Sequence, residues 1–172
     1  FTEFIRSQEY SYDVKPNIKI NNLGGFFKIK HKSHFLIIDA DKPPQKKFSK
    51  SYQSGPLSFE YFLDGLKIIT NSGFGCNISK KIELLSRLTA CQSTLTINDT
   101  SITKFEKNEV ISNIFGNSIQ DSFKSFDITS KNESDIVGCT ATNNGYEKKF
   151  GCTHKREIYL DKKNNYLKGT DH

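Results

Sequence analysis

The stretch QSGPLSFEYFLDGLKIITNSGF, residues 53–74, contains the pattern that decides the fold. Apolar or aromatic residues occupy every second position from 57 to 63, which is the period of a β-strand. Asp64 and Gly65 follow, a pair that suits the positive φ angles of a two-residue type I′ turn, and residues 66–70 lead back. The stretch therefore predicts a β-hairpin, which brings Gln53 and Asn71 close together at its open end.

Segments on both sides of this hairpin also have the features of strands. Residues 26–32 alternate apolar and basic side chains, and residues 34–40 form a more fully apolar run after a short polar break, which predicts a second hairpin. Further short strands are expected at 92–98, 110–115, 126–129, 136–142, 156–160 and 166–168. Residues 79–86 are the one segment with a helical pattern, and Ser79 can cap it. The sequence predicts an all-β fold, an antiparallel β-sandwich built from hairpins with at most one short helical turn near 79–86.

The length of 172 residues suits one domain. Residues 1–22 show no sustained periodicity, so we interpret them as a lead-in or linker and residues 23–172 as the β-sandwich domain. The chain contains no Met and stops just after a strand-like run, from which we expect an excerpt of a longer protein. No apolar run approaches the length of about 18 residues that spans a bilayer, so no membrane partner is expected.

The net charge of +6 would suit a polyanionic partner. Only three of the 25 basic residues are arginine and the lysines are scattered, which favours solvated strand faces and loops. Nucleic acid is not expected, since no recognised motif accompanies the charge. The four cysteines are too far apart for a Cys-x-x-Cys site. Buried free thiols are the preferred interpretation, and a disulfide between Cys139 and Cys152 is the alternative if the parent protein is secreted.

Standard catalytic signatures are absent from the sequence: it has no P-loop, no dinucleotide-binding glycine motif, no His-Glu-x-x-His and no Gly-x-Ser-x-Gly. His31 and His34 flank a lysine-rich turn, where solvated side chains are expected more often than metal ligands. His154 opens the basic run His154-Lys155-Arg156 at the start of an expected strand, where a hydrogen-bonded structural histidine is the usual finding. Motif searching alone therefore indicates no enzyme.

Four blocks in order carry a family resemblance. They are LGGFFKIKHKSHFLIIDADKPP (23–44), GPLSFEYFLDGLKIITNSGF (55–74), SRLTACQSTLTIND (86–99) and GYEKKFGCTHKREIYLDKKNNYLKGTD (145–171). In this order they resemble the C-terminal β domain of the heparinase II/III-like family of polysaccharide lyases. The resemblance covers most of the chain, from about residue 23 to residue 171.

The resemblance implies a parent protein that cleaves uronic-acid glycans by β-elimination, with an α/α-toroid domain upstream of the sandwich and an acidic polysaccharide between the two. The main catalytic groups would then lie on the upstream domain, so the parent is expected to be an enzyme and the isolated domain to be inactive. Its location would be periplasmic or secreted. The alternative is a non-catalytic glycan-binding or structural sandwich with a degenerate metal site.

Many members of the family that the chain resembles bind zinc through two histidines and an aspartate. By the same resemblance, those positions fall on Gln53, Asn71 and Gln92. Neutral amides lack the imidazole nitrogen or anionic oxygen that zinc selects, so we expect no metal and no cofactor. A hydrogen-bonded cluster of amides could hold the hairpin and the loop together instead.

Four residues at family-like positions are candidates for substrate binding: Arg87, Tyr146, His154 and Arg156. Either arginine could grip a carboxylate or sulfate through two parallel hydrogen bonds, or it could form a salt bridge or clamp loop carbonyls. Tyr146 could stack on a sugar ring or belong to the core. The sequence leaves these alternatives open.

Overall fold

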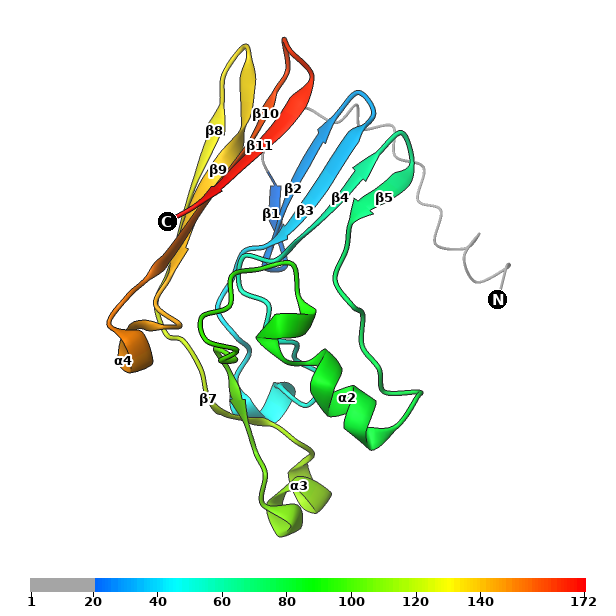
Figure 1. Cartoon of the computed structure of the whole chain (residues 1–172), viewed down its shortest axis with the longest axis vertical. Helices are drawn as coiled ribbons and strands as arrows, with labels where there is room; N and C mark the ends of the chain where they lie inside the picture. The colour runs from blue at the N-terminus through cyan, green and yellow to red at the C-terminus, as the bar shows by residue number, and fades with distance from the viewer. Residues whose placement is uncertain (1–20) are drawn as a thin grey trace.

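The computed structural model describes residues 21–172. Of the expected lead-in, residues 1–22, the first 20 lie outside this part of the chain, and residues 21 and 22 belong to a strand of the first sheet. Two antiparallel sheets pack against each other (Figure 1). The first sheet has the order β1-β2-β3-β4-β5 and contains β1 (Asn21–Leu23), β2 (Phe26–His31), β3 (His34–Asp39), β4 (Phe59–Leu63) and β5 (Leu66–Ile69). The second has the order β11-β10-β9-β8 and contains β8 (Phe126–Asn132), β9 (Ile136–Asn143), β10 (His154–Asp161) and β11 (Tyr166–Asp171). The expected sandwich of hairpins is thus confirmed.

The hairpin that opened the sequence analysis forms as predicted. Asp64 and Gly65 have φ angles of 51° and 79°, so both central residues of the turn adopt the positive φ that a type I′ turn requires. β4 pairs with β5 from Leu63 and Leu66 onward, with an irregularity in register at Tyr61 and Phe62. The turn chemistry of the sequence therefore sets where the chain reverses.

The main core lies between the two sheets. Buried side chains alternate along β3 and β10, so one face of each strand points inward. Phe27, Leu36 and Ile38 from the first sheet meet Ile158 and Leu160 from the second, and each is 1% exposed. Burying a side chain of this size contributes roughly 2 kcal/mol. The inward-facing side chains of both sheets thus form the core that holds the sandwich together.

Short helices and a small sheet lie at one end of the sandwich, away from the hairpin tips at the top of Figure 1. They are η1 (Lys46–Phe48), α2 (Lys80–Ser86), η2 (Thr89–Cys91), β6 (Lys104–Phe105), α3 (Glu109–Phe115), β7 (Ile119–Asp121) and α4 (Glu147–Phe150). Ser79 caps α2, with its hydroxyl accepting a hydrogen bond from the backbone N–H of Ile82, as expected. No helix within residues 21–172 is long and apolar enough to cross a membrane.

Three details of the predicted secondary structure are wrong. The segment 110–115, expected as a strand, belongs to helix α3, because the side chain of Asn108 accepts hydrogen bonds from the N–H groups of Val110 and Ile111 and caps it. The segment 92–98, which was expected as a strand, forms none. Its one β-type pairing is an isolated bridge between Ile97 and Thr100. The limit of one helical turn is also too low, since α3, α4 and two 3-10 turns accompany α2.

The cysteines are all free thiols. Cys139 is buried in the main core, and burial raises the pKa of its thiol to about 12. Cys152 packs at the edge of a second core around Tyr146, so the alternative disulfide between Cys139 and Cys152 is not formed. Cys76 is exposed, which differs from the expectation of burial.

Candidate functional site

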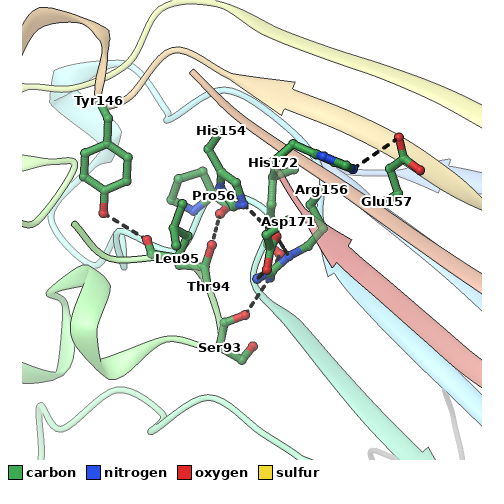
Figure 2. Close-up of polar contacts among 11 residues, drawn as sticks. Pro56, Ser93, Thr94, Leu95, Tyr146, His154, Arg156, Glu157, Asp171 and His172 are labelled. Atoms are coloured by element: carbon green, nitrogen blue, oxygen red, sulfur yellow. Dashed lines mark hydrogen bonds and ion pairs between the residues drawn. The ribbon is translucent and has the colours of Figure 1, made fainter. Parts of the chain in front are cut away.

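Arg156 lies on β10 and joins three separate parts of the chain. Its Nη1 donates to the carbonyl oxygens of Leu57, at 2.7 Å, and Ser93, at 2.8 Å. Its Nε and Nη2 donate to the two carboxylate oxygens of Asp171 on β11, at 2.6 and 2.8 Å (Figure 2). The side chain is 8% exposed, and its guanidinium lies 5.3 Å from the ring centre of Phe59. Arg156 therefore forms both a salt bridge and a clamp on loop carbonyls, which is the second of the two roles considered for it from the sequence.

His154 belongs to the same cluster. Its Nε2 lies 2.8 Å from Oδ1 of Asp171, and the ring is 1% exposed (Figure 2). Burial lowers the pKa of His154, and the carboxylate of Asp171 opposes this shift in part. Burial also disfavours the charge on Asp171, but hydrogen bonds from Arg156 and His154 outweigh it and lower the pKa of that carboxyl. The neutral ring is thus enclosed by protein and acts as a structural hydrogen-bond donor.

Tyr146 is a core residue. It is 1% exposed, and its hydroxyl donates towards the carbonyl oxygen of Leu95 at 2.9 Å (Figure 2). The carbonyl oxygen of Thr100 lies 3.2 Å from the same hydroxyl. The ring packs with Phe150 in the second core. Its aromatic face is therefore occupied by the protein itself.

Arg87, just after α2, is completely buried. Its Nε donates to the carbonyl of Tyr52 at 2.8 Å, and its Nη2 donates to the carbonyl of Ser49 at 2.9 Å. The guanidinium lies 4.0 Å from the ring centre of Phe105, a cation–π contact. Burial lowers the pKa of Arg87. Arg87 thus fixes the segment 49–52 from the inside, and Nη1 of Arg87 has no hydrogen-bond partner among the described residues.

The three positions that the resemblance links to zinc line one cavity of about 680 Å³, here called the amide cavity. Gln53, Asn71 and Gln92 share its wall with three residues that the sequence analysis did not select: Asp39, Tyr52 and Glu60. The structure therefore brings the end of the hairpin, the returning strand and the loop after η2 to one place. Within residues 21–172, no hydrogen bond joins two of the three amides.

The amides have unequal roles in this cavity. Nε2 of Gln92 donates to the carbonyl of Ser86 at 2.8 Å. Oδ1 of Asn71 accepts from the backbone N–H of Ser93 at 2.8 Å, and the hydroxyl of Ser93 lies 3.0 Å away. Gln53 makes no side-chain hydrogen bond within residues 21–172. Two of the three amides thus hold loops in place.

This donor set does not fit zinc. The three side chains are neutral amides, and the Asn71 oxygen and the Gln92 nitrogen are already used by the protein. Within residues 21–172, no group of three His, Cys, Asp or Glu side chains is arranged to hold a metal ion.

His34 is buried, with Nδ1 2.7 Å from the Tyr61 hydroxyl, so the expectation that it is solvated is wrong. His31 is half-buried in the same β2–β3 hairpin.

Asp39 gives the amide cavity a group that can exchange a proton near neutrality. Burial raises the pKa of its carboxyl to about 7, and the neighbouring charge of Asp41 adds to this shift. Tyr52 also has a raised pKa because of burial, so its phenol stays protonated. Asp39 stands in the quoted block 23–44, but only the folded environment distinguishes it from the other acidic residues. The cavity thus combines a carboxyl that titrates near neutrality with amides, with two further carboxyl groups, Asp41 and Glu60, and with Lys42.

A larger groove, here called the lysine groove, has a volume of about 1250 Å³. It lies among α2, α3 and the β6–β7 pair, and it shares no wall residue with the amide cavity. Its wall carries Lys50, Lys80, Lys104 and Lys107. None of these lysines was selected from the sequence, because they are spread over 58 positions and come together only in the fold.

The comparisons with known proteins give one match. The profile of the family described as Heparinase II/III-like, C-terminal, matches residues 15–172. Neither the comparison with curated proteins nor the comparison with solved structures found a match.

Proposed function

Since the chain belongs to the heparinase II/III-like family, as its C-terminal domain, we propose that it is the β-sandwich domain of a polysaccharide lyase that acts on uronic-acid-containing glycans by β-elimination. The family match over residues 15–172 is the observation that carries this proposal. The main catalytic groups would belong to an upstream toroid domain of the same protein. The domain described here would supply a rigid wall on one side of the acidic polysaccharide.

The chemistry of β-elimination sets what each part must do. A group must neutralise the uronate carboxylate so that the adjacent carbon can lose its proton, and a base and an acid must move that proton and protonate the leaving oxygen. Arg87 and Arg156 are buried and bonded to the protein's own oxygens, so neither is available to neutralise a substrate carboxylate. This supports the placement of the catalytic groups outside the sandwich.

The test is an activity assay on the parent protein with its upstream domain. A panel of glycosaminoglycans and alginates would be incubated with the protein, and the ultraviolet absorbance of unsaturated uronate products would be followed. We expect a rise with at least one acidic glycan. Absence of product from every glycan in the panel would contradict lyase activity.

A second candidate is a non-catalytic sandwich that binds glycans or supports a partner domain, with a degenerate metal site. It is favoured by the amides at all three positions linked to zinc. In that case the chain would bind glycans without product formation. Binding of acidic glycan by a parent that releases no unsaturated product would select this candidate over the first.

A further inference from the structure

The lysine groove has an uneven distribution of charge. Four lysines line it, and all four side chains are exposed. Within residues 21–172, none of their ammonium groups forms an ion pair or a hydrogen bond. Lys104 is the one with an acidic neighbour on the adjacent strand, since it contributes to the lowered pKa of Asp121 after Lys148. The groove therefore presents cations that the protein does not neutralise by direct contact.

Two of the described residues in the wall are acidic, Glu83 and Glu106. The carboxylate of Glu106 accepts the backbone N–H groups of Lys107 and Asn108, both at 3.0 Å, and its side chain is 7% exposed. Glu83 is half-buried and lies close enough to Arg87 to raise the pKa of that guanidinium against the effect of burial. Among the described wall residues, four lysines therefore outnumber two carboxylates.

The position of one lysine is set by packing. A Cβ atom added to Gly116 would lie 2.8 Å from Cγ of Lys50, so the stem of Lys50 runs directly over this glycine. The φ angle of Gly116 is 72°, which favours glycine at the end of α3. The backbone of the same segment is held from below by Arg87 through the carbonyls of Ser49 and Tyr52. Lys50 is thus directed into the groove from both sides.

The rest of the wall suits a sugar chain better than a nucleic acid. Asn113 and Gln120 are exposed amides that can donate to and accept from sugar hydroxyls. Among the described residues of the wall, Phe105 is the one aromatic residue, and it is 8% exposed and covered by Arg87, so it offers no ring face for stacking on bases. Ammonium groups bind sulfate or carboxylate as point charges.

We propose that the lysine groove binds a segment of an anionic polysaccharide, with Lys50, Lys80, Lys104 and Lys107 contacting its sulfate or carboxylate groups. The proposal rests on the proposed function only for the glycan class. It places glycan binding away from the buried arginines, and away from the amide cavity. It concerns binding alone, and no chemical step occurs in the groove.

The experiment measures affinity of the 172-residue chain for a heparin oligosaccharide, an alginate oligosaccharide and an oligothymidylate, at low and at high salt. The variant Lys50→Gln/Lys80→Gln/Lys104→Gln/Lys107→Gln removes the groove cations. The matched control Lys30→Gln/Lys124→Gln/Lys163→Gln/Lys168→Gln removes four exposed lysines outside the groove and changes the net charge equally. Asn113→Glu is a third variant, which places a carboxylate in the groove without removing a lysine.

We expect the groove variant to weaken glycan binding at least about tenfold and the control to change it by less than about threefold. Asn113→Glu should also weaken binding. All variants should unfold at the same denaturant concentration as the unsubstituted 172-residue chain, because the substituted side chains are exposed. Stronger binding of the heparin oligosaccharide would assign sulfate as the preferred group, and stronger binding of alginate would assign carboxylate. Equal weakening by the groove and control variants would overturn the proposal.

Two further outcomes would also overturn it: no binding of either glycan at low salt, or tighter binding of the oligothymidylate than of both glycans. The failure of this proposal can be distinguished from the failure of the proposed function. A parent that forms no unsaturated product while its groove still binds glycan would reject β-elimination alone. A parent that forms product while the groove variant binds normally would reject the groove alone.

Discussion

The amide cavity and the lysine groove both take wall residues from the segment 50–53, and they use polar side chains in different ways. In the amide cavity, Asn71 and Gln92 make hydrogen bonds that hold loops in place. In the lysine groove, the four ammonium groups have no such bonds within residues 21–172. Polar groups that the fold already uses are poor candidates for ligand binding, whereas charges left without partners are available for it. This difference favours the groove as the ligand site, although the family resemblance directs attention to the cavity.

The largest expected loss of stability comes from Arg87→Met, which affects the segment 49–53, because this segment supplies Lys50 to the groove and Tyr52 and Gln53 to the cavity. The change leaves the carbonyls of Ser49 and Tyr52 without their donor in a buried place and should lower the free energy of unfolding by about 3 kcal/mol. Urea unfolding measures this. The control Lys80→Met, on the same side of the molecule but exposed, should change it by less than about 0.5 kcal/mol. A small loss for Arg87→Met would show that the segment 49–53 is held by other contacts.

The second prediction concerns the pH dependence that Asp39 gives to the amide cavity. Its folded pKa of about 7 lies above the ordinary value of 3.8, so the folded state binds the proton more tightly, and this group's contribution to stability is lost as the pH rises from about 4 to about 7. Asp39→Asn removes this loss and should raise the free energy of unfolding at pH 8 by about 4 kcal/mol relative to its effect at pH 4. Urea unfolding at both pH values measures it. An equal effect of Asp39→Asn at the two values would contradict the raised pKa.

The third prediction compares Asn71, whose side chain accepts hydrogen bonds, with Gln53, whose side chain forms none within residues 21–172. Asn71→Ala removes the acceptor of the Ser93 N–H and should cost about 1 kcal/mol. Gln53→Ala, on the same wall, removes no hydrogen bond and should cost less than about 0.3 kcal/mol. Denaturant unfolding of the pair gives the difference directly. Equal costs would mean that the two amides are used alike.

The smallest expected effect is that of zinc. Because the three positions linked to zinc carry neutral amides that are partly in use, we expect added zinc to leave the midpoint of thermal unfolding unchanged, and purified protein to hold no stoichiometric zinc by elemental analysis. Calcium serves as the control cation. A rise in the midpoint with zinc alone would contradict the degenerate site.

Much of the fold could be predicted from the sequence because its determinants are local. Alternation predicted β2 and β4, a continuous apolar run predicted β3, and Asp64-Gly65 predicted the turn between β4 and β5. Helix α3 was missed, although Asn108 is a typical cap and residues 110, 111, 114 and 115 have helical spacing. The apolar run at 110–115 was predicted to be a strand because most of the segments around it were predicted to be strands.

The candidate site was harder to predict because burial depends on residues far away in the sequence. Nothing next to Arg87 or Arg156 indicates that their partners are carbonyls 35 to 99 positions away. The lysines of the groove come from four separate segments, so in the sequence they look like the other solvated lysines. The raised pKa of Asp39 likewise depends on what surrounds it after folding.

The clamp around Arg156 has a consequence for the order of folding. Its partners lie 15, 63 and 99 positions away along the chain, so the clamp closes only after both sheets have come together. Contacts between residues far apart in the chain require closure of a long loop, and the entropy lost in that closure slows folding. We therefore expect the clamp to form after the rate-limiting step, so that its loss speeds unfolding and leaves the rate of folding nearly unchanged. Arg156 would then slow the unfolding of the sandwich and so lengthen the lifetime of the folded state.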